Sequence, residues 1–314
     1  MVQIKFDSAK LWSSLVKGVN ALIKEAEFET TKEGLHLRAI DDAHIAMIDL
    51  DIPSDSMKEY SFTLHDKEAD FAKFGINITE MATIMRRIPI GEKLTLTLDS
   101  QKSKFHVVAD SLYTKRRFSI PLLGSTSAED IPVPKIDFTT KIKLKAKYLK
   151  EAIKDAAVMG DYLKLKTTAD KFSLWAEGDT GNVSIDYEYG ESISLEKRGD
   201  AVGIYALKYL DDMTDPIPGE SEVSIEFSND MPLKLTWMLN GSKLDYYLAP
   251  RIPPSDEEPP KKEEKEQEKT KDDTEEEKET HEETKEFPCD ECGKTFTSQR
   301  GLNTHMRVHK DSDE

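Results

Sequence analysis

The first 251 residues contain an internal repeat, and this feature limits the possible folds more than any other. When the sequence is laid over itself so that Lys10 meets Lys147, Phe28–Ala39 lies over Leu165–Ala176. A second, slightly smaller offset matches later positions in the same order: Gly75 with Gly203, Ile76 with Ile204 and Met85 with Met213. Coincidence among strand-rich segments is the alternative explanation. Since helix and strand positions agree in order, the repeat predicts two copies of one unit, each with two helices and many strands.

The apolar residues of this region follow two different periods. Alternation of apolar and polar residues, as in Leu94–Leu98 and Leu233–Trp237, is typical of half-buried antiparallel strands. Helical spacing is limited to four segments: 8–24, 78–88, 146–159 and 206–213. We therefore expect an α+β fold with two duplicated subdomains, 1–118 and 137–251. The connector loop between them, 119–136, is rich in proline, serine and acidic residues.

Charge and cysteine content exclude several classes of protein. The chain has 44 basic and 61 acidic residues, and its net charge of −17 argues against coating nucleic acid by bulk charge. A local basic surface remains compatible with that total. Both cysteines lie after residue 286, so we expect a reducing compartment rather than a disulfide-stabilised secreted protein. The sequence has neither a long apolar run nor a secretory signal at its start.

Residues 252–286 have a different composition from the repeat. They contain 7 basic and 16 acidic residues, and 261–286 includes no aromatic or aliphatic side chain. Such a segment cannot bury enough apolar surface to offset the entropy lost on folding. The composition predicts a disordered acidic linker over 252–286.

A metal-binding pattern occupies residues 287–309. Two cysteines in a C-x-x-C turn are followed, after twelve residues, by two histidines one helical turn apart: Cys289, Cys292, His305 and His309. Two thiolates on a turn and two imidazoles on one helix face can form a closed tetrahedral zinc site. The segment resembles the two-cysteine, two-histidine zinc finger family, which implies a ββα fold around one structural Zn²⁺. A short tail, 310–314, follows it.

The residues that read DNA bases in that family are unfavourable here. By position they correspond to Ser298, Gly301 and Thr304. Glycine has no side chain to reach a base edge, and neither hydroxyl residue makes the bidentate contact that selects a base. We therefore expect the finger to provide weak DNA tethering or protein binding rather than sequence-specific recognition.

The repeat region carries no recognisable catalytic motif. It lacks a glycine-rich phosphate loop, a nucleophile elbow and any cysteine. Asp211, Asp212 and Asp215 resemble a magnesium site, but solvated turn residues are the simpler interpretation. We expect a binding protein rather than an enzyme, without catalytic residues.

Basic residues recur on the predicted helices of both copies. They are called the helix cations below: Lys10, Lys17, Lys24, Arg86, Arg87, Lys147, Lys150, Lys154 and Lys208. Residues seven apart share a helix face, and so do residues three and four apart. This pattern is compatible with ordinary solvated helix faces. The functional interpretation is a DNA-facing surface that contacts phosphates without reading bases.

Three segments resemble the proliferating cell nuclear antigen (PCNA) family, the archaeal and eukaryotic DNA sliding clamps: Leu37–Leu50, Phe227–Leu235 and Tyr246–Arg251. The resemblance covers residues 1–251 and is stronger to archaeal members. It implies a homotrimeric ring of clamp-like subdomains, with sheets outside and helices lining a hole for double-stranded DNA. It also implies docking of DNA polymerase, clamp loader, flap endonuclease and ligase, and a cytoplasmic, nucleoid-associated location in archaea or a nuclear one in eukaryotes. The acidic linker and finger depart from the usual family pattern.

The resemblance also implies a groove for short partner peptides under the connector loop. By position the groove would use a docking set of ten residues: Ile40, His44, Met47, Ile131, Pro132, Pro232, Tyr247, Leu248, Ala249 and Pro250. Ring closure would pair an edge around 105–118 with an edge around 174–187 of the neighbour. Lys115, Arg116 and Arg117 would then face acidic residues.

Two other functions remain open from the sequence. The first is a zinc-finger regulator whose repeat region is a dimerisation or ligand domain. The second is a clamp subunit that works only in a heterotrimer. A mass of three chains would favour the homotrimeric clamp, and a monomer would favour the heterotrimer.

Overall fold

The computed structural model describes residues 2–63, 70–124, 131–190, 193–197 and 199–251, with two short strands at 287–288 and 295–296. The chain divides into two units, Met1–Glu257 and Glu258–Glu314. The expected disordered linker lies outside the described residues, as do the four expected zinc ligands. No helix in the described part of the chain is long and apolar enough to cross a membrane.

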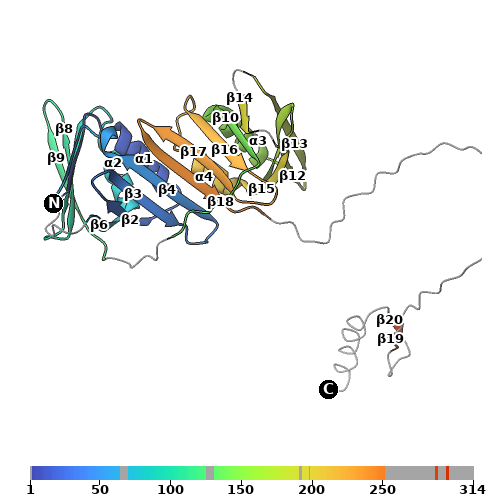
Figure 1. Cartoon of the computed structure of the whole chain (residues 1–314), viewed down its shortest axis with the longest axis horizontal. Helices are drawn as coiled ribbons and strands as arrows, with labels where there is room; N and C mark the ends of the chain where they lie inside the picture. Colours follow the sequence, from blue (N-terminus) through green and yellow to red (C-terminus); the bar gives the residue numbers. More distant parts are fainter. Residues whose placement is uncertain are drawn as a thin grey trace, which may run out of the picture. The chain divides into compact units, whose positions relative to one another are not determined.

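The first unit contains the same series of elements twice (Figure 1). The first half consists of β1 (Val2–Phe6), α1 (Lys10–Asn20), β2 (Glu25–Thr30), β3 (Gly34–Ile40), β4 (Ala46–Pro53), the 3₁₀ turn η1 (Ser54–Ser56), β5 (Glu59–Phe62), β6 (Ala72–Asn77), α2 (Ile78–Arg86), β7 (Lys93–Asp99), β8 (Lys104–Asp110) and β9 (Lys115–Pro121). The second half consists of β10 (Thr140–Lys145), α3 (Ala146–Ala157), β11 (Tyr162–Thr167), β12 (Lys171–Gly178), β13 (Gly181–Glu188), β14 (Ile193–Lys197), β15 (Ala201–Ala206), α4 (Leu207–Thr214), β16 (Glu222–Phe227), β17 (Leu233–Leu239) and β18 (Ser242–Leu248).

Strand register confirms that the two halves repeat residue by residue. Phe28 lies opposite Leu37 in the β2–β3 pair, and Leu165 lies opposite Leu174 in the β11–β12 pair. The sequence repeat matches these same residues, Phe28 with Leu165 and Leu37 with Leu174. The α+β duplication predicted from periodicity is therefore present in the fold.

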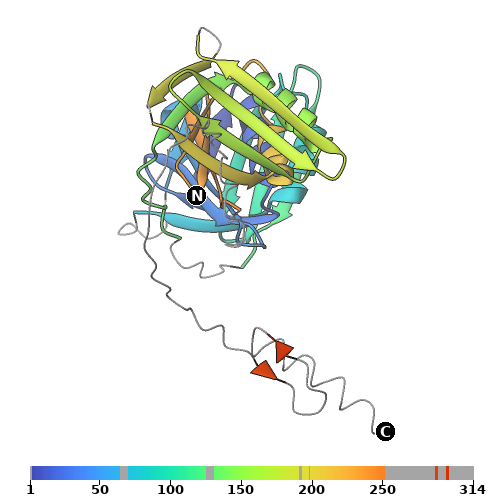
Figure 2. The same ribbon diagram turned by 90° about the vertical axis from the view of Figure 1, so that its right-hand side faces the viewer.

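All strand pairs of the first unit are antiparallel and form three sheets. The five-stranded sheet has the order β5-β1-β7-β8-β9, and the four-stranded sheet has the order β13-β12-β11-β15. The nine-stranded sheet, β14-β10-β16-β17-β18-β4-β3-β2-β6, contains strands from both halves. They meet where β18 pairs with β4, with Leu244 opposite Leu50. Figure 2 faces the four-stranded sheet, with β12 and β13 in yellow-green.

The helices are amphipathic and pack in pairs, α1 with α2 and α3 with α4. On α1, Leu11, Trp12 and Leu15 are buried, whereas Lys10 and Lys17 are exposed. Such an apolar stripe holds a helix on a sheet and leaves the opposite face to solvent. The exposure of Lys10 and Lys17 is thus a consequence of how α1 packs.

The α1 helix is shorter than the sequence predicts. It ends at Asn20, and the N–H groups of Ala21 and Leu22 bond to the carbonyl oxygens of Gly18 and Val19, respectively. Leu22 and Ile23 continue the helical spacing, but Ile23 is buried in the turn that leads into β2. Lys24 therefore lies outside the helix, and the prediction that it shares a helix face with Lys17 was wrong.

The β9 strand continues past the expected subdomain boundary at residue 118. Pro121 pairs with Lys104, and the next two residues bond through their N–H groups to Ser103 and Gly75. The first part of the expected connector is therefore held on the first half of the repeat.

Candidate functional site

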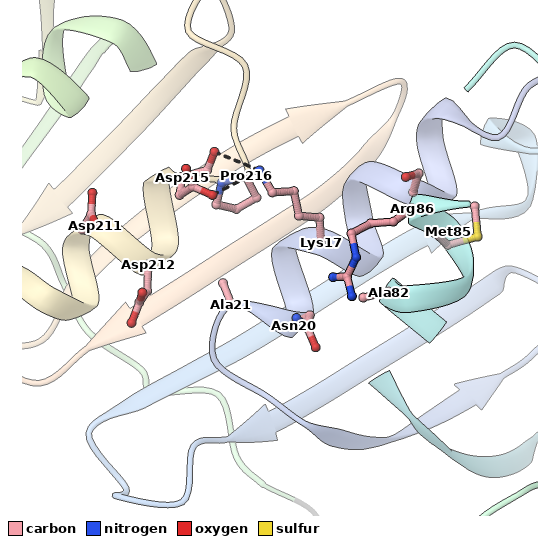
Figure 3. A pocket seen from close by; sticks show the side chains of 11 residues that line it. Lys17, Asn20, Ala21, Ala82, Met85, Arg86, Asp211, Asp212, Asp215 and Pro216 are labelled. Atoms are coloured by element: carbon pink, nitrogen blue, oxygen red, sulfur yellow. Dashed lines mark hydrogen bonds and ion pairs between the residues drawn. The ribbon is translucent and has the colours of Figure 1, made fainter. Parts of the chain in front are cut away.

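Two helix cations from different halves meet at one residue. The Nζ atom of Lys17, on α1, lies 3.1 Å from Oδ2 of Asp215 (Figure 3). The Nζ atom of Lys150, on α3, donates a 3.0 Å hydrogen bond to the backbone oxygen of Asp215. Asp215 is the C-cap of α4, so both lysines are directed at the carboxy-terminal end of that helix.

The remaining helix cations differ in whether they have a carboxylate partner. Lys147 forms a 2.8 Å ion pair with Glu220, Lys208 a 3.1 Å pair with Asp212, and Lys24 a 3.9 Å contact with Asp42. The guanidinium group of Arg86 donates to the Thr83 hydroxyl. Among the described residues, four helix cations are exposed and have no carboxylate partner: Lys10, Arg86, Arg87 and Lys154.

Opposite charges meet where β10 and α3 approach the loop before β16. Glu220 accepts 2.8 Å hydrogen bonds from both Lys145 and Lys147. These bonds lower the pKa of Glu220 to about 2. The bond to Glu220 also raises the pKa of Lys147. Lys147 is therefore less available to a phosphate than its position on the helix suggests.

A second candidate surface lies on the outer face of β4 and β18. Met47, Tyr247 and Phe138 form a small buried cluster, against which Ile131, Val133 and Ile136 pack. The segment after residue 130 is thus held on the sheet by apolar contact. The sequence-based docking set included Met47, Tyr247 and Ile131, and the structure brings these three together.

Arg38 fixes the same segment through a polar contact. Its guanidinium group donates a 2.9 Å hydrogen bond to the backbone oxygen of Ile131 and lies 3.0 Å from Asp49. Arg38 was missed in the sequence because it belongs to a regularly alternating strand. The feature that could have identified it is its position directly opposite the acidic Asp49 in the β3–β4 pair.

The β3–β4 turn beside this cluster is organised by Asp41. The carboxylate accepts hydrogen bonds from the N–H groups of Ala43, Ile45 and Ala46 and from the hydroxyl of Tyr209. Burial raises the pKa of Asp41, but these hydrogen bonds outweigh it and the net shift is downward. The turn therefore has a fixed shape around an ionised carboxylate.

The structure places the rest of the docking set less uniformly. Ile40, His44, Pro132 and Ala249 are exposed, and Pro232 and Pro250 are half-buried. The N–H of Ala249 bonds to the oxygen of Ile45, which places the end of β18 beside the β3–β4 turn. Leu248 is fully buried in the main core and cannot contact a partner, because alternate residues of β18 face opposite sides. Ile45, with 39% exposure, and Val133 are further apolar residues here that the sequence reading missed.

Within the described residues, each end strand of the five-stranded and four-stranded sheets leaves one edge unpaired in the strand order. The end strands are β5 and β9 in the five-stranded sheet, and β13 and β15 in the four-stranded sheet. The expected edges at 105–118 and 174–187 were too broad, because β8 and β12 are paired on both sides. Beside β9, Arg86, Arg87, Arg116 and Phe118 line a hollow of about 450 Å³.

Comparison with known proteins identifies the family. A profile described as "Proliferating cell nuclear antigen, N-terminal domain" matches residues 1–120, and its C-terminal counterpart matches residues 132–252. The chain belongs to the PCNA family. A profile described as "C2H2-type zinc finger" matches residues 286–312, so the finger is an addition to a PCNA body.

Archaeal members of the PCNA family are similar over the whole body. The "DNA polymerase sliding clamp" of Thermococcus fumicolans is 33% identical over 254 residues, which cover 80% of this chain and 98% of that protein. The protein of the same name from Methanococcus maripaludis is 31% identical and covers 77% and 95%. The crystal structure of PCNA from Thermococcus kodakaraensis matches with a TM-score of 0.74 at 25% identity, covering 80% of this chain and all of that one. A. fulgidus PCNA, solved with the C-terminal region of FEN-1 bound, has the same fold with a TM-score of 0.72 at 23% identity, and covers 81% of this chain and all of that one.

Proposed function

We propose that this PCNA-family chain is a DNA polymerase sliding clamp that closes as a homotrimer around duplex DNA. The observation that carries the proposal is the internal seam between β18 and β4, together with the unpaired edges of β9 and β13. In the repeat, β9 corresponds to β18 and β13 corresponds to β4. The chain therefore offers to a second copy the same two edges that it has already joined within itself.

The internal seam predicts the register between copies. Tyr246 lies opposite Ile48 in the β18–β4 pair. The offset that matches Met85 with Met213 places Phe118 in the position of Tyr246. Val183 takes the position of Ile48, because Val183 lies opposite Ala176 as Ile48 lies opposite Ala39. Phe118 is therefore expected opposite Val183 of the partner subunit.

Helix packing at the internal seam gives a second expectation. Gly18 of α1 lies against Leu244 and Tyr246 of β18. The repeat places Asp155 in the position of Gly18, and Arg116 in that of Leu244. Asp155 of the partner subunit would therefore approach the arginine-lined hollow beside β9. The contact between copies would be ionic where the internal contact is apolar.

A ring built in this way would enclose DNA without gripping it tightly. We assign the helix cations to the lining, where they would contact phosphates of double-stranded DNA without sequence preference. A closed ring cannot leave a duplex sideways, so weak contacts suffice for processive DNA replication. The role is non-catalytic, and its location would be cytoplasmic in an archaeon or nuclear in a eukaryote.

The outer surface would carry the partners. The docking set, without Leu248, includes Met47 and Tyr247 of the buried cluster, and its exposed Ile40, Pro132 and Ala249 would offer apolar side chains for contact. Such a surface suits short motifs with aliphatic and aromatic anchors. DNA polymerase, clamp loader, flap endonuclease and ligase are the partners we assign to it. We retain subdomains 1–118 and 137–251 as the units that repeat around the ring, with the connector 119–136 between them, of which residues 119–123 are held on the first subdomain.

The finger would bind one Zn²⁺ through Cys289, Cys292, His305 and His309. Phe287–Pro288 (β19) pairs antiparallel with Thr295–Phe296 (β20), which fits the hairpin of a ββα finger. Thiolates and imidazoles are the ligands that zinc prefers in closed structural sites. A zinc content of one per chain, lost on replacing Cys289 with serine, would test this assignment.

Sedimentation equilibrium at micromolar concentration tests the proposed ring. We expect three times the chain mass of 35.6 kDa. Loaded protein should remain on closed circular DNA, leave after linearisation and stimulate a polymerase on primed circles. A stable monomer would favour the heterotrimeric alternative, and sequence-selective binding to linear duplex would favour the regulator.

A further inference from the structure

The carboxy-terminal end of α4 binds a lysine from each half of the clamp. Lys17 lies 3.1 Å from the carboxylate of Asp215 and 3.5 Å from its backbone oxygen, and Lys150 lies 3.0 Å from the same backbone oxygen. The three residues come from α1, α3 and the end of α4 (Figure 3 shows Lys17 and Asp215). One acidic residue thus supplies acceptors to two of the helix cations.

These acceptors have the chemistry of a DNA phosphate. The end of a helix carries a partial negative charge from its free carbonyl groups, and Asp215 adds a full charge there. Burial lowers the pKa of Lys150, the positive charges of Lys17 and Lys154 lower it further, and the charge of Asp215 opposes them. Asp215 therefore offsets repulsion among three lysines, as a bound phosphate would.

The repeat makes the acidic residue at this position unusual. The offset that matches Met85 with Met213 places Asp215 where the first half has Arg87. Arg87 is exposed and has no carboxylate partner among the described residues. The same place in the repeat thus adds a cation in one half and neutralises cations in the other.

We propose that Asp215 is an internal counter-ion that competes with DNA phosphates for Lys17 and Lys150 and so keeps the clamp's contact with DNA weak. This inference rests on the proposed function of a DNA-encircling ring. Each lysine that neutralises a phosphate strengthens binding and steepens its dependence on salt. A residue that occupies two lysines therefore lowers the friction of sliding.

Removing only the charge of Asp215 tests the proposal in the full-length protein. Asp215→Asn should bind a short linear duplex about three- to tenfold more tightly at low salt, with a steeper loss of affinity as salt rises. The same variant should diffuse more slowly on end-blocked DNA. Asp215→Ser gives a second charge-removing variant if the asparagine protein unfolds. Glu59→Gln is the matched control, because it removes one charge from the 2.6 Å Lys5–Glu59 pair between β1 and β5.

Replacing Lys17 and Lys150 distinguishes a counter-ion for these two lysines from a general effect of the protein's net charge on DNA binding. The gain from Asp215→Asn should disappear when Lys17 and Lys150 are both alanine, since no cation is then released. Equal affinities of Asp215→Asn and Glu59→Gln would overturn the proposal, and so would a gain that persists without the two lysines. A failure of the proposed function would be recognised in a different experiment. Wild-type protein would then not form a trimer or not remain on closed circular DNA. Binding to a short linear duplex, which tests the counter-ion, does not require a ring.

Discussion

The hydroxyl group of Tyr209 on α4 donates a 2.7 Å hydrogen bond to Oδ2 of Asp41, 168 residues away in the chain. Asp41 shapes the β3–β4 turn, which lies between Ile40 and Met47 of the docking set. Burial and this bond together raise the pKa of Tyr209 to about 12, so the phenol remains a donor at neutral pH. A helix of the second half therefore supports a turn on the first.

Tyr209→Phe removes that support and leaves the rest of the side chain in place. We expect the free energy of unfolding to fall by about 1–2 kcal/mol, because Asp41 loses one donor and keeps three. Amide exchange should accelerate in residues 41–46. Tyr113→Phe is the control, since Tyr113 is 90% exposed and its hydroxyl has no partner among the described residues. Equal stability of the two variants would contradict the structural role of this bond.

His36 makes the stability of the body depend on pH. Its Nδ1 lies 2.8 Å from Asp51, and its Nε2 lies 3.3 Å from Asp49. The hydrogen bond to Asp51 raises the pKa of His36 above 6.5, and the charges of both carboxylates outweigh the nearby Arg38. The stabilisation is complete below pH 6.5 and is lost as pH rises through the higher folded-state pKa.

We expect the melting temperature of wild type to fall just above pH 6.5, and His36→Asn should flatten this fall. Melting curves on both sides of that pH measure the effect. His44→Asn serves as the control, because His44 is exposed and has no carboxylate partner among the described residues. An unchanged profile in His36→Asn would show that the imidazole does not gain charge on folding.

Gly18 is required by close packing at the internal seam. A Cβ atom there would lie 2.7 Å from Cδ2 of Leu244 and 3.1 Å from the Tyr246 hydroxyl oxygen. Gly18→Ala should therefore destabilise the body by about 1–3 kcal/mol, although alanine favours helices. Denaturant unfolding measures this, with Gly91→Ala as control, since a Cβ at Gly91 meets nothing within 4 Å. A stabilised Gly18→Ala protein would mean that the seam is looser than the structure shows.

Cysteine pairs test the proposed register between copies. Asp245 lies opposite Asp49 at the internal seam, and the repeat places Arg117 and Ser184 in those positions. Zinc-loaded Arg117→Cys/Ser184→Cys protein should form a covalent trimer on oxidation, visible in denaturing gels without reductant. The off-register pair Arg117→Cys/Asp186→Cys should cross-link much less. Preferential linking by the second pair would refute the register while leaving the trimer intact.

Zinc removal should affect the finger alone. A closed zinc site supplies the folding energy of a small finger, whereas the body has its own large apolar core. Chelation should therefore release one Zn²⁺ per chain and leave the melting transition of the body unchanged. A large drop in the melting temperature of the body would show that its stability depends on the finger.

Local patterns in the sequence predicted the fold well. Alternation at Leu233–Trp237 and the repeat of Phe28–Ala39 identified strands and the duplication, because core contact imposes a period of two on each strand. The end of α1 was mispredicted, because Leu22 and Ile23 contact the core for reasons unrelated to the helix. Periodicity records burial and does not record which element produces it.

The candidate sites were less predictable, because they depend on contacts between distant residues. Sequence spacing located Lys17 and Lys150 but not Asp215 as their common acceptor, which required the placement of three helices. The contact of Arg38 with the backbone of Ile131 was also not predictable, since the two residues are 93 apart in the chain. The resemblance wrongly placed Leu248 in the groove. It matches positions along the chain and does not show which side of the sheet each side chain faces.

The seam between β18 and β4 differs from its proposed counterpart in one respect that matters for loading. The internal seam is filled by apolar contact around Gly18 and is crossed by a continuous polypeptide. The counterpart between copies would depend on strand pairing and on arginines facing a carboxylate. A clamp loader that opens the ring to admit DNA would therefore need the least free energy at the interfaces between chains. High salt would weaken these interfaces before it weakens the internal seam.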